Sequence, residues 1–305
     1  MVAETKKQYF FEEVVSCEMC GDDSSRHPVI GLRLNKSTGM RPGRRDGIAV
    51  AVKRCRKCRL LYSSPQPIPN NIQDHYGIPP ENYWRPEYFK WHQDYFLSQI
   101  IRAKELLNFK EGMKALDIGA GLGKGMRSLS KAGFDTYGLE PSRPFYDRAL
   151  SLMDVDPMRL KLGMVEDISY ENESFDFITF SAVFEHLYHP SQSLEKAMKW
   201  LKPGGVIHIE VPSSKHLVPK FFNFYYKLSG TSYVSNISPM HDPFHMYEFG
   251  LRSFVELGKA LHFEVVDHIY YVGDIVFIPG IFHPFLRKFM KWTNTGMQLE
   301  VWLKK

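Results

Sequence analysis

The stretch that most constrains this 305-residue chain runs from position 115 to 129 as ALDIGAGLGKGMRSL. An apolar, strand-like run is closed by Asp117, and Gly119, Gly121 and Gly123 then occupy every second position before a helical pattern begins. Glycine lets a chain turn sharply and lets a ligand approach the backbone, and a helix that starts after such a loop presents free N–H groups. The stretch therefore predicts a strand–loop–helix unit that binds a cofactor.

Two classes of cofactor use this geometry. A dinucleotide site needs a further glycine at position 124, which is Lys124 here, and a loop without negative charge beside the pyrophosphate. Asp117 would repel a pyrophosphate, but it would attract the ammonium and sulfonium groups of S-adenosylmethionine (SAM). Glu140 ends the next apolar run, where an acidic side chain accepts ribose hydroxyls. These residues favour SAM over the competing interpretation, a β-to-α turn whose glycines serve packing alone.

All four cysteines lie in the first 58 residues, as Cys17-x2-Cys20 and Cys55-x2-Cys58. Each C-x-x-C knuckle turns two thiolates toward one point, and Zn²⁺ favours four such ligands in a tetrahedron. Disulfide bonds are the competing use, but the N-terminus has no long apolar segment typical of a secretory signal. We therefore expect a closed, structural zinc site, with a loop-rich insert between the knuckles.

Composition narrows the remaining classes. No run of 18 apolar residues exists, so no membrane-spanning helix is expected, and a reducing cytoplasm is the default compartment. Residues 1–60 hold 13 Lys and Arg against 7 Asp and Glu, so the basic balance of the chain belongs to its N-terminal segment. Such a segment could attract nucleic acid or a phosphorylated metabolite, or it could be an ordinary solvated surface.

The order of apolar runs predicts two parts. Residues 1–69 are expected to form a zinc-ribbon module and an extended, proline-rich linker, and residues 70–305 an α/β body. Within the body we expect a helix over 87–107, repeated strand–helix units, and a parallel sheet covered by helices on both sides. Residues 212–250 interrupt the pattern and are expected to form a lid or substrate-covering region. The expected strands are 114–119, 135–140, 160–165, 175–180, 206–211, 263–267 and 297–303.

Three further segments carry a family resemblance, namely Glu173–Asp176 (ESFD), Val183–Leu187 (VFEHL) and Leu201–Gly205 (LKPGG). With the glycine loop, they make residues 113–212 resemble class I SAM-dependent methyltransferases. The resemblance implies a Rossmann-like sheet of seven strands, the last two antiparallel at one edge. With its cysteine knuckles, the chain is similar to bacterial methyltransferases that act on sugars or other small molecules at oxygen or carbon.

The resemblance also implies a set of cofactor residues. Many members place an Asp after strand three to bind the adenine amino group, whereas this chain has Met164 there. The adenine contact is therefore expected either from backbone groups near Val165 and Glu166 or from a carboxylate shifted by a residue or two. The expected SAM-binding set is Asp117, Gly119, Gly121, Gly123, Glu140, Val165, Glu166 and Ser181.

Methyl transfer to a hydroxyl or an acidic carbon requires an aligned nucleophile and a base that removes a proton. Histidine suits this role because its pKa lies near neutrality. His186 follows strand four, and His241 and His245 lie in a later loop expected to reach over the pocket. We take His245 as the candidate base or substrate anchor, with His186 and His241 as alternatives. A metal site of His241, Asp242 and His245 is a weaker interpretation.

Three functions are compatible with these residues. The first is SAM-dependent methylation of a small molecule, with a hydroxyl or carbon of a sugar, sugar nucleotide or related metabolite as the acceptor. The second is methylation of RNA or DNA gripped by the basic ribbon. It is disfavoured because base methylases often carry an Asn/Asp-Pro-Pro-Tyr/Phe segment where this chain has Ser181–Glu185 (SAVFE). The third is a noncatalytic scaffold, which the intact glycine loop disfavours. Nothing in the sequence indicates an oligomeric state.

Overall fold

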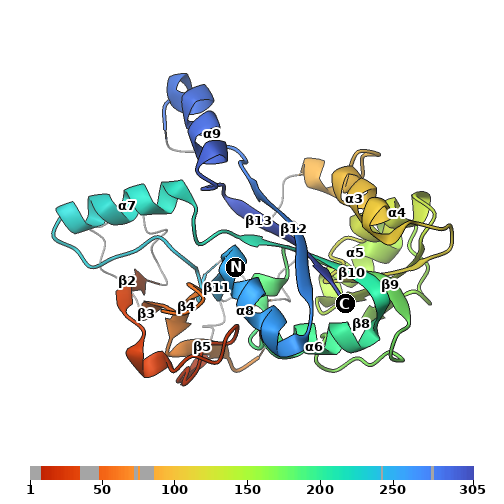
Figure 1. Cartoon of the computed structure of the whole chain (residues 1–305), viewed down its shortest axis with the longest axis horizontal. Coiled ribbons are helices and arrows are strands. Elements are labelled where there is room, and N and C mark those ends of the chain that lie inside the picture. Colours follow the sequence, from red (N-terminus) through yellow and green to blue (C-terminus); the bar gives the residue numbers. More distant parts are fainter. Residues whose placement is uncertain (1–7, 35–47, 72–74, 76–85, 242, 276–277) are drawn as a thin grey trace, which may run out of the picture.

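Short apolar runs of the central chain form one seven-stranded sheet, with the strand order β12-β13-β10-β9-β6-β7-β8 (Figure 1). The five strands from β10 to β8 are parallel. Strand β13 pairs antiparallel with β10, and β12 pairs antiparallel with β13. This confirms the predicted Rossmann-like α/β fold. The strands are β6 (Lys114–Ile118), β7 (Asp135–Glu140), β8 (Leu160–Leu162), β9 (Phe175–Ser181), β10 (Leu201–Pro212), β12 (Glu264–Tyr271) and β13 (Gln298–Lys304).

The structure is a computed structural model. It describes residues 8–34, 48–71, 75, 86–241, 243–275 and 278–305. Asp242, which belonged to the weaker metal interpretation, and much of the expected insert between the cysteine knuckles lie outside these residues.

Helices cover both faces of the sheet because alternate residues of each buried strand point to opposite sides. On one face, Ile100, Leu129 and Trp302 belong to one apolar cluster. On the other face, Leu194 and Phe254 belong to a larger cluster. The helices of the sheet region are α3 (Leu97–Leu107), α4 (Lys124–Lys131), α5 (Arg143–Leu152), α6 (Pro190–Trp200) and α8 (Leu251–Leu261).

The N-terminal module is built from two small sheets. The first pairs β1 (Tyr9–Glu12) with β5 (Gln66–Pro69), and the second has the order β11-β4-β3-β2. Residues 59–69 therefore do not form the expected linker. They belong to the module itself, because Leu60, Leu61 and Tyr62 are buried and β4 pairs with β3. The strands of the second sheet are β2 (Val29–Leu34), β3 (Ala49–Arg54), β4 (Leu61–Ser64) and β11 (Tyr247–Glu248), and a short helix η1 (Ser24–Arg26) precedes β2.

The region 212–250 contains α7 (Leu217–Leu228) and then returns to the N-terminal module. The Leu32 N–H donates to the Ser232 carbonyl, and the Val234 N–H donates to the Leu32 carbonyl. Strand β11 then pairs antiparallel with β4. Beyond β12, a short helix η4 (Gly280–Phe282) leads into α9 (His283–Trp292), which stands away from the sheet at the top of Figure 1.

Two expected elements differ from the structure. The helix expected over 87–107 is a short helix η2 (Pro86–Phe89) followed by α3, because Phe96 has a left-handed backbone (φ 63°) that separates them. The Trp91 Nε1–H donates to Ser128 Oγ at 2.9 Å, so the intervening turn packs on α4. The expected strand 160–165 ends at Leu162, because Gly163 adopts φ 159° and a turn follows.

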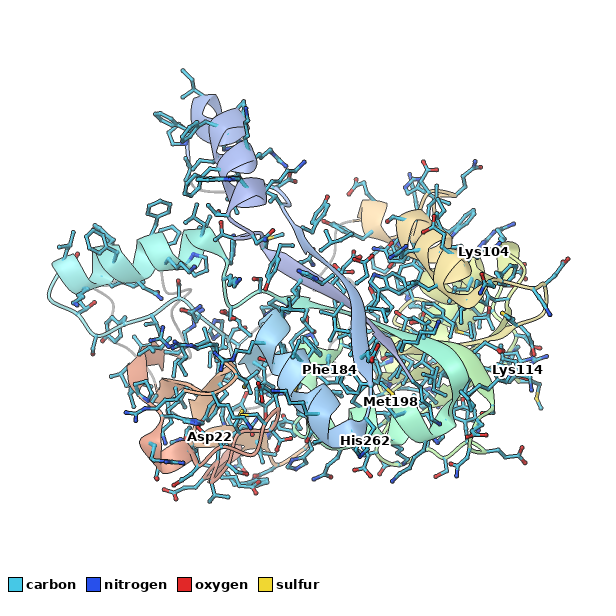
Figure 2. All side chains as sticks on the ribbon, viewed as in Figure 1. Asp22, Lys104, Lys114, Phe184, Met198 and His262 are labelled. Carbon is cyan, nitrogen blue, oxygen red and sulfur yellow. The ribbon has the colours of Figure 1, made fainter. Side chains whose placement is uncertain are left out.

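One apolar cluster runs from the cysteine knuckles to the central sheet. Cys17, Met19 and Cys58 belong to the same cluster as Phe180 and Phe184. Phe184 and Met198 are buried. Figure 2 shows them near the centre of the molecule, whereas Asp22 lies in the N-terminal module. Among the described residues, no helix has the length and apolar character needed to cross a membrane.

We predict that Phe184→Ala lowers the free energy of unfolding by about 3–5 kcal/mol, because it leaves a cavity where several rings meet. Its ring centroid lies 5.5 Å from that of Phe180, 5.3 Å from that of Phe249 and 5.9 Å from that of Phe254. Urea unfolding measures the change. Met158→Ala is the control, because Met158 is 84% exposed and should shift stability by less than about 0.5 kcal/mol. Equal effects of the two substitutions would contradict the central role of Phe184.

Candidate functional site

The glycine loop lies where β6 ends and α4 begins. The N–H groups of Gly119 and Ala120 both donate to the Leu139 carbonyl at 2.8 Å, which fixes the loop against the end of β7. Gly119 has φ 72°, and a Cβ there would lie 2.4 Å from Val183 Cγ2. Gly121 also has a positive φ, but a Cβ there would meet only Phe145, at 3.9 Å. Gly121 therefore keeps a backbone surface open to a ligand.

Asp117 is buried at the end of β6, beneath the loop. Its carboxylate accepts a hydrogen bond from the Met126 N–H in the first turn of α4, and a Cβ on Gly125 would lie 2.6 Å from its Oδ2. Burial raises the pKa of Asp117 to about 7. Asp117 thus holds the helix start against the loop.

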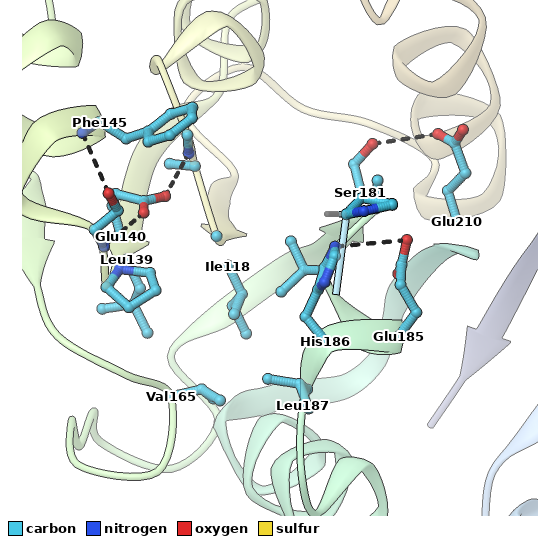
Figure 3. Close-up of a pocket in the computed structure, with 18 of the residues that line it drawn as sticks. Ile118, Leu139, Glu140, Phe145, Val165, Ser181, Glu185, His186, Leu187 and Glu210 are labelled. Atoms are coloured by element: carbon cyan, nitrogen blue, oxygen red, sulfur yellow. Dashed lines mark hydrogen bonds and ion pairs between the residues drawn. The ribbon is translucent and has the colours of Figure 1, made fainter. Parts of the chain in front are cut away.

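Glu140 reaches across the cofactor end of the site from the last residue of β7 (Figure 3). Its Oε2 accepts the Gly121 N–H at 2.7 Å, and its Oε1 accepts the Ser142 N–H at 2.8 Å. Burial raises the pKa of Glu140 to about 7, while these two hydrogen bonds oppose the rise. Each carboxylate oxygen retains a second lone pair, so Glu140 can still accept hydroxyl groups of a ligand.

A cavity of about 770 Å³ opens at the carboxyl ends of the parallel strands. This is the edge where ligands bind in open α/β sheets. Its volume falls within the range of about 300–1,000 Å³ typical of small-molecule sites. The lining comes from the glycine loop (119–122), the end of β7 and the start of α5 (139–142 and 145), residues 163–166, residues 181–183 and 185–188, Glu210, residues 243–245, and aromatic and polar residues before and within α3.

Three titratable groups meet at the other end of the cavity, opposite Glu140 (Figure 3). Glu185 and His186 lie in a short helix η3 (Phe184–His186) after β9, and His245 comes from the segment before β11. Glu185 Oε1 lies 3.9 Å from His186 Nε2 and 3.8 Å from His245 Nε2. The two imidazole centroids are 5.0 Å apart.

Burial disfavours the charged form of each of these groups. It raises the pKa of Glu185 to about 8, lowers the pKa of His186 to about 4, and lowers the pKa of His245 well below its usual value. His186 Nδ1 lies 3.3 Å from the Phe244 carbonyl oxygen, which can only accept, so Nδ1 carries the proton. In the neutral ring, Nε2 then holds a lone pair. The set can take up a proton at imidazole nitrogen.

A second polar pair lines the cavity on the same side as Glu185 and His186 (Figure 3). The Ser181 hydroxyl donates to Glu210 Oε2 at 3.2 Å. Burial and the nearby Glu300 raise the pKa of Glu210 to about 7. Tyr95 faces the same space, and burial together with the charges of Asp117 and Glu210 raises its pKa to about 12.

The four cysteine sulfurs converge as the sequence predicts. Cys17 Sγ lies 3.4 Å from Cys58 Sγ, and Cys20 Sγ lies 3.5 Å from Cys55 Sγ, with all four atoms within 4.8 Å of one another. Tetrahedral zinc with Zn–S bonds of about 2.3 Å requires sulfurs about 3.8 Å apart, so the set fits this ion. The knuckles have matching turns, because the residues after Cys20 and Cys58 donate to the carbonyls of Cys17 and Cys55.

Comparison with known proteins identifies the family. The methyltransferase domain family matches residues 89–268, which is more than half of the chain. The chain belongs to the SAM-dependent methyltransferases. This confirms the resemblance drawn from the glycine loop and the segments after it.

Individual relatives of this methyltransferase are distant. It is 32% identical over 114 residues to the mitochondrial ubiquinone biosynthesis O-methyltransferase of Candida albicans, covering 35% of this chain and 34% of that one. It is 23% identical over 210 residues to a probable S-adenosylmethionine-dependent methyltransferase of Mycolicibacterium smegmatis, covering 68% and 65%. The match spans about a third or less of the length of the first curated relatives.

Among solved structures, an S-adenosylmethionine dependent methyltransferase from Mesorhizobium loti aligns with a TM-score of 0.48 at 12% identity, covering 70% of this chain and 98% of that one. A complex between the Haloferax volcanii Trm112 methyltransferase activator and a methyltransferase aligns with a TM-score of 0.47 at 17% identity, covering 70% and 92%.

The structure brings most of the expected cofactor residues to one cavity. Gly119, Gly121, Glu140, Val165, Glu166 and Ser181 line it. Asp117 and Gly123 are not among its lining residues, because Asp117 lies beneath the loop and Gly123 faces Val155 and Ala149. Glu166 also contacts α6, since the Ser193 hydroxyl donates to its Oε1 at 2.8 Å.

The three candidate histidines are not equivalent. His186 and His245 line the cavity, whereas His241 does not and instead lies 2.9 Å from the guanidinium of the buried Arg33. Sequence reasoning did not select Glu185 or Glu210. Glu185 stood within the EHL segment, and Glu210 is an acidic residue inside the apolar run of β10, so both carried a sequence signal.

We predict that His186 stays neutral from about pH 7.5 to about pH 5.5, where an ordinary histidine with a pKa of about 6.5 would titrate. The reason is burial, which lowers the pKa of His186 to about 4. NMR spectra of the protein with labelled histidine measure this, and the signal missing in His186→Gln gives the assignment. A midpoint near pH 6.5 for that signal would show that the ring is solvated, not buried.

Proposed function

We propose that this chain transfers a methyl group from SAM to a small-molecule acceptor, at a hydroxyl or carbon of a sugar, sugar nucleotide or related metabolite. The observation that carries the proposal is one cavity with a cofactor wall at one end and a buried Glu–His–His set at the other. Its volume of about 770 Å³ suits a cofactor together with a compact acceptor.

SAM would supply the methyl group carried on its sulfonium. Glu140 would accept the ribose hydroxyls through the lone pairs left after it binds the Gly121 and Ser142 N–H groups. The open backbone at Gly121 would receive the aminoacyl tail. The apolar side chain of Val165, 4% exposed, would contact the adenine.

The acceptor would lie between the cofactor and the Glu–His–His set. We assign proton removal to His245, because its ring is neutral at neutral pH and comes from the segment that covers this end of the cavity. Glu185 Oε1 lies 3.8 Å from His245 Nε2, so a proton on the imidazole would favour the ionised form of Glu185, which would in turn stabilise the positive ring. His186, held by the Phe244 carbonyl, would position the acceptor or share the proton.

The cysteine cluster would hold a structural zinc ion. All four ligand positions are filled by protein thiols, which leaves no open position for catalysis. Strand β4 follows Cys58 and pairs with β11, which begins two residues after His245. The ion would therefore stabilise the segment that carries the proposed base.

We predict that His245→Gln lowers methyl transfer by about 10²–10⁴-fold, the usual contribution of a general base. The measurement is transfer of label from methyl-labelled SAM to a panel of sugar nucleotides and phosphorylated metabolites. SAM binding by calorimetry should be unchanged, because His245 lies 3.8 Å from Glu185, which is at the end of the cavity away from Glu140 (Figure 3).

Two matched variants control this experiment. His241→Gln should retain transfer, since His241 lies outside the cavity lining, and Glu140→Ala should lose SAM binding. Transfer lost in His186→Gln but retained in His245→Gln would assign the base to His186. Label appearing only on RNA, with a salt-sensitive gel shift, would favour the nucleic-acid alternative that the basic N-terminal segment suggests.

We predict that Cys58→Ser removes the zinc, normally about one ion per chain, and lowers label transfer through displacement of β11. Metal analysis by mass spectrometry measures the first effect. Ser63→Ala is the control, because Ser63 is buried in β4 but is not a ligand. Full zinc content in Cys58→Ser, or no metal in the wild-type protein purified with zinc under reducing conditions, would contradict the site.

A further inference from the structure

Helix α7 exposes a continuous apolar stripe. Phe221, Phe224, Tyr225 and Leu228 recur at helical spacing and are 53%, 62%, 56% and 71% exposed. Residues spaced by three, four and seven positions lie on one side of a helix. The opposite side is anchored through the buried Tyr226, and the first turn is anchored through the buried Val218. The stripe is therefore a face of a well-packed helix that the described residues leave uncovered.

Helix α9 and the turn before it carry a second such stripe. Ile281, Phe282, Phe285 and Trp292 are 83%, 54%, 72% and 81% exposed. The rings are in register along the helix, because Phe289 lies between Phe285 and Trp292 at centroid distances of 6.5 Å and 6.1 Å. So many large exposed side chains on one element are unusual for a surface that faces only water.

The start of α7 packs against α9 and the residues that follow it. Leu217 at the start of α7 packs in one apolar cluster with Met290 of α9 and with Val272 after β12. The Leu217 N–H also donates to the Thr295 carbonyl at 3.2 Å, just beyond α9. In Figure 1, α9 stands at the top of the molecule and α7 runs to the left above the N-terminal module, so both helices extend beyond the central sheet.

The charged residues of the two helices are all basic, so this surface is positive. Neither helix sequence contains Asp or Glu, while Lys220, Lys227, Lys288 and Lys291 are exposed. Arg287 is the fifth basic residue, and it pairs with Asp274 at 3.2 Å. Aromatic and aliphatic side chains flanked by lysines are typical of helices that lie in the interface of an anionic membrane.

We propose that α7 and α9 together form a peripheral membrane-binding surface that inserts its aromatic stripes into the headgroup region of an anionic bilayer. A second copy of the chain fits less well, because two such surfaces would bring like charges together. An anionic bilayer supplies both the apolar layer and the opposite charge. The proposal goes beyond methyl transfer and does not depend on which acceptor the cavity binds.

Flotation with vesicles tests the proposal. The wild-type protein should float with vesicles of phosphatidylcholine containing about three-tenths phosphatidylserine, and much less with phosphatidylcholine alone. Phe285→Ser combined with Trp292→Ser should lower the bound fraction at least about tenfold, because these are the largest exposed apolar groups. Lys288→Glu combined with Lys291→Glu should have a similar effect through lost attraction.

The control must separate this surface from the basic N-terminal segment, which could bind anionic vesicles by charge alone. Met158→Ser, at another 84% exposed apolar residue, should float like the wild type. Insertion should also shift the emission of Trp292 to shorter wavelength in the presence of vesicles. That component of the shift should be absent in Trp292→Phe, which keeps an apolar ring.

Three results would overturn the proposal. The first is no flotation of the wild-type protein with anionic vesicles. The second is flotation that is unchanged in both double variants, because binding would then come from another surface. The third is a dimer in solution that dissociates in the Phe285→Ser and Trp292→Ser variant, which would make the stripes a contact between copies of this chain.

Discussion

The antiparallel pairing of β4 with β11 connects the two halves of this molecule. Leu61 and Tyr62 directly follow the second cysteine knuckle, and they pair with Glu248 and Tyr247, which closely follow His245. The Tyr247 hydroxyl then donates to the Tyr188 carbonyl, and the Met246 N–H donates to the Glu185 carbonyl. The position of the segment that contributes residues 243–245 to the cavity lining is therefore set by residues about 180 positions earlier in the chain.

Buried carboxyl groups define the electrostatics of the cavity. Asp117, Glu140, Glu185 and Glu210 all have pKa values raised by burial. Such groups are stabilised by a nearby cation, because water no longer solvates their charged forms. A cofactor with a sulfonium and an ammonium group would provide that charge, whereas a pyrophosphate would add to the repulsion. The cavity favours a cationic ligand for the same reason that the glycine loop does.

Much of this architecture could be predicted from local sequence. The parallel strands and the cysteine cluster follow from apolar runs and from ligand spacing, which are local signals, whereas the antiparallel edge is implied by the family resemblance. The linker expected over residues 59–69 was wrong because strand pairing with β3 and β1 depends on distant partners. The same limit applies to His241, since only the fold shows that Arg33 lies 2.9 Å from it.

Asp117 gives a second example of this limit. Its place before the glycine loop predicts a role in cofactor binding, whereas its contact with the start of α4 depends on how the helix packs back. Glu210, an acidic residue inside an apolar strand, carries a sequence signal, but its neighbours Ser181 and Glu300 are close to it only in the folded chain. Partners that are close only in space carried the information that the sequence pattern lacked.

The shared apolar cluster has a consequence for how the chain comes apart. Cys17, Cys55 and Cys58 belong to one apolar cluster with Phe184 and Phe254, so the module and the sheet share a core. A domain that folds alone needs its own closed core. The module and the sheet should therefore unfold as one cooperative unit. Oxidation of the thiols would then lower the stability of the sheet as well as that of the module.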